Sequence, residues 1–166
     1  KANNLAAALD ELKERGVWLF GAEAEQVVFT MNATHALNIA VHSLVRPGDE
    51  VVISGFEHNA VCRPLTAAGA ELKIAGRKLF DPEDTLRAFD AALTERTRAV
   101  FCTHVSNVFG YILPVERIAA LCRARGVPFV LDASQSAGTL PLSLRELGAA
   151  FLAMPGHKGL YGPQGT

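Results

Sequence analysis

The chain has 166 residues, of which 49% are hydrophobic and 20% charged, and its formal net charge is −1. This length and composition suit one ordered domain with a sizeable core and exclude a disordered protein. Basic and acidic residues are scattered rather than grouped, and no apolar run is long enough to span a bilayer. Neither a nucleic acid nor a membrane is therefore expected as a partner.

The predicted elements alternate between apolar runs bounded by turn residues and segments of helical periodicity, which is typical of an α/β protein. In chain order, helices are predicted over about 4–15, 34–45, 60–68, 82–93, 115–125 and 142–147. Strands are predicted over 26–30, 50–54, 71–74, 99–103, 128–131 and 150–154. Gly16 should end the first helix, and Asp81 followed by Pro82 should begin the fourth. Continuous apolar strands favour a mostly parallel sheet covered on both faces, a three-layer α/β/α arrangement.

The three cysteines, Cys62, Cys102 and Cys122, are widely spaced and form no Cys-x-x-Cys pair. This argues against a disulfide framework or a zinc site and favours a reducing, cytoplasmic location. Cys102 and Cys122 should act as small apolar groups, and Cys62 should face into its helix. The histidines lack metal-ligand spacing, so no metal is predicted; they are His35, His42, His58, His104 and His157.

Polar residues follow several predicted strands, at 32–35, 57–58, 104–107, Asp132 and Lys158. In open α/β sheets, ligands bind beyond the carboxyl ends of the strands. These residues are therefore expected to converge on one edge of the sheet, where they would form a site.

Lys158 lies between glycines, directly after a histidine, where a partly desolvated amine can attack a carbonyl to form a Schiff base. Alternatively, the segment is a surface turn with a solvated lysine. Asp132 ends an apolar strand, so it is either the partner of a protonated heteroaromatic nitrogen or a helix N-cap. Gln135 could bond an oxygen of the same ligand or be a polar turn residue.

Five phrases carry a family resemblance: residues 32–38, 57–61, 104–110, 131–138 and 156–166. In order and spacing they resemble the cysteine desulfurase group of the class V aminotransferases, which use pyridoxal phosphate (PLP). The resemblance covers nearly the whole chain. It implies that residues 1–166 are part of the PLP-binding large domain of a fold-type I enzyme. Such an enzyme takes sulfur from cysteine and leaves alanine.

The resemblance implies roles for the residues that match its motifs. Lys158 resembles the lysine that holds PLP as a Schiff base and then moves a proton at the substrate Cα. Asp132 resembles the aspartate that pairs with the pyridine nitrogen, and Gln135 the residue that bonds the ring hydroxyl. His58 resembles the histidine stacked on the ring, with an acid–base role; otherwise it is a polar loop residue.

The phosphate is assigned to the start of a predicted helix, at Ala33, Thr34 and His35. Helix N–H groups and the helix dipole favour an anion there, although Thr34 is also a good N-cap. His157 resembles a second phosphate contact. Asn107 resembles the asparagine near the ring hydroxyl and the substrate carboxylate, or is simply a turn residue.

The chain departs from the family pattern at two positions. Pro155 stands where a phosphate-binding serine is common, and His35 stands where a second threonine is common. The family's sulfur-accepting cysteine and carboxylate-binding arginine lie beyond the lysine, and none of the three cysteines is at that place. Because the chain also starts without methionine, we expect a piece of a longer protein.

Other functions stay open at this point. Within the same fold, β-elimination, transamination and epimerisation are alternatives, and a truncated, non-catalytic module is another. No Gly-x-Gly-x-x-Gly, P-loop or Gly-x-Ser-x-Gly motif supports a dinucleotide-binding oxidoreductase, a nucleotide hydrolase or a serine hydrolase. The family resemblance further implies a homodimer with the site at its interface, an amino-acid substrate such as cysteine, and a sulfur-acceptor protein.

Overall fold

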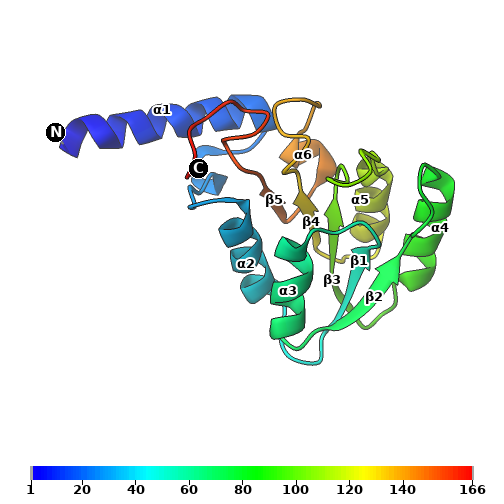
Figure 1. Cartoon of the computed structure of the whole chain (residues 1–166). Coiled ribbons are helices and arrows are strands. Elements are labelled where there is room, and N and C mark those ends of the chain that lie inside the picture. Colours follow the sequence, from blue (N-terminus) through cyan, green and yellow to red (C-terminus); the bar gives the residue numbers. More distant parts are fainter. Residues whose placement is uncertain (1, 166) are drawn as a thin grey trace.

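A computed structural model describes residues 2–165, in which helices and strands alternate along the chain (Figure 1). The helices are α1 (Ala2–Phe20), the short 3-10 helix η1 (Ala24–Gln26), α2 (Ala33–Leu44), α3 (Asn59–Ala67), α4 (Pro82–Ala92), α5 (Val115–Ala124) and α6 (Leu144–Leu147). The strands are β1 (Glu50–Ser54), β2 (Glu71–Ala75), β3 (Thr97–Thr103), β4 (Phe129–Asp132) and β5 (Phe151–Ala153). Within the described range, no helix combines the length and the apolar character that crossing a membrane requires.

The five strands form one sheet in the order β2-β1-β3-β4-β5, and every pairing between them is parallel. The central strand β3 pairs with β1 on one side and with β4 on the other, with Phe101 opposite Ile53 and Val130. The predicted α/β class with a parallel sheet is therefore confirmed. Because the strands run in the same direction, all their carboxyl ends lie at one edge of the sheet.

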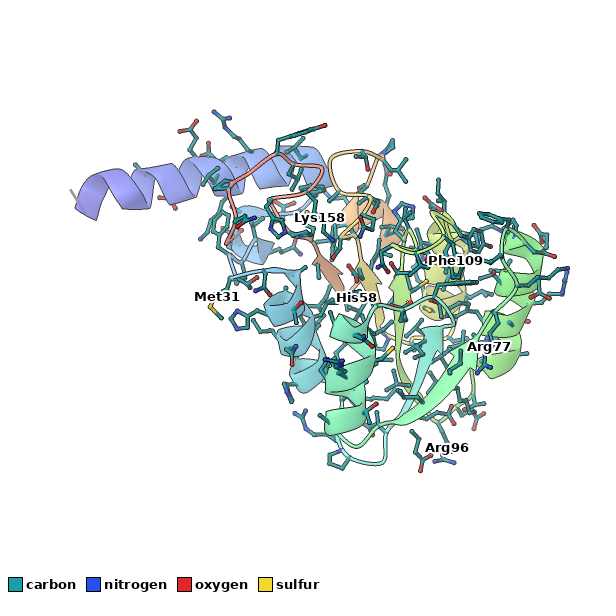
Figure 2. The ribbon with its side chains drawn as sticks, viewed as in Figure 1. Met31, His58, Arg77, Arg96, Phe109 and Lys158 are labelled. Atoms are coloured by element: carbon teal, nitrogen blue, oxygen red, sulfur yellow. The ribbon has the colours of Figure 1, made fainter. Side chains whose placement is uncertain are left out.

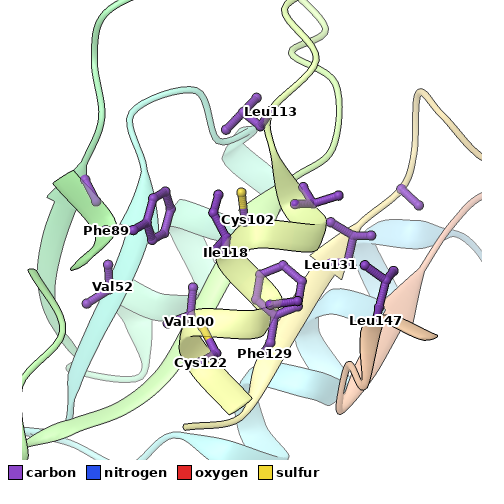
Figure 3. Packing of buried hydrophobic residues seen from close by; sticks show 14 of the residues in the cluster. Val52, Phe89, Val100, Cys102, Leu113, Ile118, Cys122, Phe129, Leu131 and Leu147 are labelled. Carbon is purple, nitrogen blue, oxygen red and sulfur yellow. The ribbon is translucent and has the colours of Figure 1, made fainter. Parts of the chain in front are cut away.

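Helices cover both faces of the sheet, since successive strand residues point to opposite sides. On one face Val52 and its neighbours pack against α4, α5 and α6 in a core that includes Phe89, Ile118 and Leu147 (Figure 3). On the other face Ile53 packs with side chains of α2 and α3. The sheet is buried between two helix layers, as the continuous apolar strands predicted.

The predicted end of the first helix at Gly16 is wrong. Helix α1 continues through Gly16 and ends at Phe20, followed by Gly21 in the left-handed conformation at φ 60°. A glycine inside a helix costs about 1 kcal/mol, which is too little by itself to end the helix. The start of α4 is confirmed, because Asp81 Oδ1 accepts from the Asp84 N–H at 2.9 Å and Pro82 is the first helical residue.

The strand predicted over 26–30 is not formed. Residues 27–30 belong to no strand of the described chain, and Val28 and Phe29 are largely exposed. β-branched and aromatic residues favour extended backbone, but a strand also requires a hydrogen-bonded neighbour. No such pairing is made by these residues within the described range.

Candidate functional site

A cavity of about 190 Å³ lies at the carboxyl edge of the sheet. Lys158 and His58 lie at this edge, whereas Arg96, which precedes β3, lies at the opposite edge (Figure 2). All of the predicted site residues except His35 contribute to the wall of this cavity. The lining residues are Asn32, Ala33, Thr34, His58, Ala60, Thr103, Val105, Asn107, Asp132, Ser134, Gln135, Pro155, His157 and Lys158.

Asp132 ends β4 in the cavity wall and is only 4% exposed. Its Oδ1 accepts from the Ser134 N–H at 2.9 Å, and its carbonyl accepts from the His104 N–H at 3.0 Å. Within residues 2–165, no lysine or arginine forms an ion pair with this carboxylate. The aspartate therefore stabilises a local turn rather than capping a helix, and it presents a buried negative group to a cationic ligand.

The loop that carries Lys158 is fixed by short backbone contacts. Within this loop, the Tyr161 N–H donates to the Lys158 carbonyl at 3.0 Å and the Gly162 N–H donates to the Gly156 carbonyl at 2.7 Å. Gly159 lies so close to the loop after β4 that a Cβ added to it would be 2.3 Å from the Ala137 carbonyl oxygen.

The loop after β5 is thereby fastened directly to the loop after β4. Gly138 shows the same approach from the other side, because its added Cβ would be 2.3 Å from the Gly159 carbonyl oxygen. Only residues without a Cβ allow two backbones to come this near. The exposed Lys158 consequently lines the same cavity as Asp132 and Gln135, which precede Gly138 in the chain.

His58 is the N-cap of α3, and its Nδ1 accepts from the Ala60 N–H at 3.0 Å. This bond requires Nδ1 to be unprotonated, so the neutral imidazole carries its proton on Nε2. His58 is thus a capping residue rather than a generic polar loop residue, and the bond orients its ring at the cavity wall.

Helix α2 begins at Ala33, as expected for an anion site at a helix start, but its N-cap is Asn32 and not Thr34. The Asn32 Oδ1 accepts from the His35 N–H at 2.9 Å, so this amide is already bonded within the protein. The prediction that His35 contacts a phosphate is not supported, because its exposed side chain is not part of the cavity wall. Ala33 and Thr34 do line the cavity, where the helix dipole favours an anion.

Asn32 and Val105 lie in the segments 32–35 and 104–107 that were expected at this edge, although neither was given a role, whereas Ala60, Thr103 and Ser134 were not identified from the sequence. Thr103 is the last residue of β3 and Ser134 follows β4 by two positions, so the rule that ligands bind beyond strand ends could have found both. Pro155 is buried in the wall, and no hydroxyl group is present at that position.

None of the three cysteines lines this cavity. Cys102 and Cys122 are buried in β3 and α5, which confirms their expected apolar role. Burial raises the pKa of Cys122 to about 12 and that of Cys102 well above its usual range. Cys62 is half-buried on α3 and lines a second cavity with Ser54, so it does not face only its own helix.

Comparison with known proteins gives consistent matches. The family model described as aminotransferase class-V matches residues 1–166. A probable cysteine desulfurase of Methanothermobacter thermautotrophicus is 35% identical over 162 residues, which cover 95% of this chain and 40% of the relative. The chain thus spans about 40% of the length of this curated relative.

Solved structures agree with the sequence matches. The apo cysteine desulfurase of Thermococcus onnurineus NA1 matches with a TM-score of 0.80 at 31% identity, covering 95% of this chain and 40% of that one. Two structures of the cystine C-S lyase C-DES match with TM-scores of 0.86 and 0.85 at 26% and 25% identity, covering 99% of this chain and 46% of theirs. One holds the reaction product cysteine persulfide, and the other is a mutant with glycine covalently linked to its PLP cofactor.

The family model matches the whole sequence, and the solved structure shares the architecture of this parallel sheet, with a lysine and an aspartate at its carboxyl edge in the present chain. The chain therefore belongs to the class-V aminotransferase family.

Proposed function

We propose that this chain forms the PLP-binding part of an enzyme that acts on an amino acid, and that the reaction is the desulfuration of cysteine. The observation that carries the proposal is the convergence of a buried carboxylate and a lysine on one cavity, from the ends of neighbouring strands. The cysteine desulfurases among its relatives and the PLP-linked C-DES structure support the choice of cofactor and substrate.

The cavity residues fit the chemistry of PLP. Asp132 is a buried carboxylate suited to a protonated ring nitrogen, and Lys158 supplies an amine for the cofactor's aldehyde. The start of α2 at Ala33 and Thr34 offers a helix terminus for the phosphate, with His157 in the facing wall. When bound, PLP supplies an electron sink that stabilises a carbanion at the substrate Cα.

The protein's own groups then bind, orient and move protons. With PLP bound, the Asp132 carboxylate would keep the ring nitrogen charged, and Gln135 and Asn107, which line the same cavity, would bond ring and substrate oxygens. The Lys158 amine, in the same wall, would move the proton at the substrate Cα. His58, whose Nδ1 accepts from the Ala60 N–H, would lie against the ring when PLP is bound, and Nε2 would be the atom left free to exchange a proton.

The proposal also concerns the complete protein, of which these residues would be one part. Residues 1–166 would form part of a large domain, since the chain spans about 40% of its curated relative. We propose that the complete protein is a cytoplasmic homodimer with its site at the subunit interface, and that it passes sulfur to an acceptor protein. The sulfur-accepting cysteine would be supplied by the remainder of the protein, because the cavity wall holds none.

The test is the absorption spectrum of the purified protein after incubation with PLP and removal of excess cofactor. We expect the wild type to retain a visible absorption band. Borohydride should reduce the Schiff base and make the attachment of the cofactor to the protein permanent. Lys158→Ala should lose this band and the covalent attachment while keeping its thermal unfolding temperature, since Lys158 is exposed. Lys78→Ala is the matched control, because it removes only a surface ion pair with Asp81. Reducible attachment in Lys158→Ala would contradict the assignment.

A C–S lyase reaction is a second candidate, favoured by the match to C-DES at a TM-score of 0.86. The two reactions differ in the fate of the substrate carbon skeleton. Incubation of the complete protein with cysteine and with cystine should yield alanine and no pyruvate if it is a desulfurase. Pyruvate and ammonia, with persulfide from cystine, would instead establish the lyase reaction.

A further inference from the structure

Glu57 lies between the carboxyl ends of β1 and β3, immediately before His58. Its Oε1 accepts from the Ser54 hydroxyl, and also from the Thr103 N–H at 2.7 Å. Its Oε2 is buried and has no hydrogen-bond partner among the described residues. One carboxyl group thus connects the last residue of β1 to the last residue of β3.

The surroundings of this carboxyl group disfavour a negative charge. No lysine or arginine in residues 2–165 forms an ion pair with Glu57, although the exposed Arg77 shares a second cavity with it. The other titratable groups that face it are Asp132 on β4, Cys102 on β3 and Cys62 on α3. All three are acidic groups, so none can neutralise a carboxylate.

Burial is the main cause that raises the pKa of Glu57 to about 8, and the Asp132 charge raises it further. The hydrogen bonds from Ser54 and Thr103 act in the opposite direction but are outweighed. Enzyme active sites are known in which an apolar environment keeps a carboxylic acid protonated at neutral pH.

We propose that Glu57 is a positioning residue of the cofactor cavity, a neutral carboxylic acid that fastens the ends of β1 and β3 together. It fixes Thr103 in the cavity wall and the loop that presents His58. Because it is uncharged, it adds no second negative charge to repel the Asp132 carboxylate. The effect on the cofactor rests on the proposed function, whereas the protonation state of Glu57 does not.

The first test needs no cofactor and measures the free energy of unfolding against pH. A folded-state pKa raised from 4.5 to about 8 means that the folded wild type keeps a proton that the unfolded chain releases. The contribution of Glu57 to the free energy of unfolding is therefore fully present below about pH 4.5 and is lost as the pH rises to about 8. In Glu57→Gln, this decrease should disappear. An unchanged decrease would contradict the proposal.

Glu50→Gln is the matched control, because Glu50 is a buried carboxylate at the opposite end of β1. The hydrogen-bonded ion pair with Lys73, at 2.7 Å, is the main cause that lowers the pKa of Glu50 to about 2. Glu50→Gln should lose stability at neutral pH and still show the decrease above pH 4.5. An infrared band of a protonated carboxyl group at neutral pH should be present in the wild type and in Glu50→Gln, and absent from Glu57→Gln.

The second test measures PLP affinity at neutral pH. Glu57→Gln retains an oxygen that can accept from Thr103, so its affinity should stay within about twofold of the wild type. Glu57→Ala leaves the Thr103 N–H without its partner and should bind PLP about tenfold more weakly. If Glu57→Gln is as weak as Glu57→Ala, the negative charge is required and the inference is wrong. If the wild type itself retains no PLP, the proposed function fails, while the unfolding and infrared measurements still decide whether Glu57 is neutral.

Discussion

Asp132 is the residue at which local structure and proposed chemistry meet. A carboxylate that is 4% exposed is costly to keep charged unless hydrogen bonds or a cation compensate for the lost water. Here the Ser134 N–H provides one such bond at 2.9 Å. A positively charged ring nitrogen in the cavity would provide the other compensation, which ties the stability of the charged group to ligand binding.

Replacing Asp132 with asparagine separates these two contributions. The asparagine oxygen can still accept from the Ser134 N–H, so the unfolding temperature should be nearly unchanged. Losing a charge-assisted bond to the ring nitrogen should weaken PLP binding by about tenfold or more. The measurement is a PLP titration followed by absorption, with Asp90→Asn on the surface as the control. Equal PLP affinity in Asp132→Asn and wild type would show that Asp132 does not pair with the ring.

At the scale of single residues, most residues of the cavity wall could be predicted from the sequence, but not every local bond. Asp132, Lys158 and His58 could be identified because each lies just beyond a predicted strand or in a family motif. The pairing of Asn32 with the His35 N–H could not, since Asn32 and Thr34 are both good caps and only the backbone geometry selects one. Glu57 could be placed at a strand end, but its burial could not be predicted, because it depends on β3, which is distant in the sequence.

The loops after β4 and β5 determine where Lys158 lies. The contact between Gly138 and Gly159 joins the segment after β4 to the segment after β5 through backbone atoms alone. Backbone contacts of this kind leave no flexible side chain to absorb a displacement. The position of the Lys158 amine relative to Asp132 therefore depends on glycine at both places.

Gly159→Ala should disturb this arrangement. The new Cβ would be 2.3 Å from the Ala137 carbonyl oxygen, so the loop after β5 must move away. We expect a loss of about 1–3 kcal/mol in the free energy of unfolding and a clear loss of PLP attachment. Both are measured by chemical denaturation and by absorption after reduction.

The control for this change is Gly16→Ala, the same substitution inside helix α1. An added Cβ there meets only ordinary contacts, at 3.6 Å from Val27, and alanine favours the helix by about 1 kcal/mol over glycine. Gly16→Ala should be neutral or stabilising and should keep PLP attachment. Unaltered stability and attachment in Gly159→Ala would show that the loop contact can relax without consequence.

Secondary structure could be predicted where local signals were unambiguous. The apolar run of β1 is predicted with the observed ends, Glu50 and Ser54, and the Asp81-Pro82 start of α4 is also correct. The failures occur where the outcome depends on the surroundings. Residues 27–30 have strand composition without a strand partner, and Gly16 is tolerated within a helix that continues past it.

Across the whole molecule, the parallel sheet explains why residues far apart in sequence share one cavity. Alternation of strands and helices was sufficient to predict a parallel sheet, and a parallel sheet was sufficient to predict that the polar residues after its strands meet at one edge. The strand order β2-β1-β3-β4-β5 could not be predicted, because apolar strands of similar composition do not specify their neighbours. That order places β4 and β5 side by side, so that Asp132 at the end of β4 and Lys158 in the loop after β5 line one cavity.

The strand order also has a consequence for how the domain is made. Strand β2 adds to one edge of β1, and β3, β4 and β5 then add one after another to the opposite edge. Each new strand extends an existing edge, so a growing chain can build the sheet during synthesis without opening a pair already formed. The cavity, however, takes its wall from both Ala33 and Lys158, near the two ends of the described chain. Cofactor capture would therefore wait until β5 and the loop that follows it have been added.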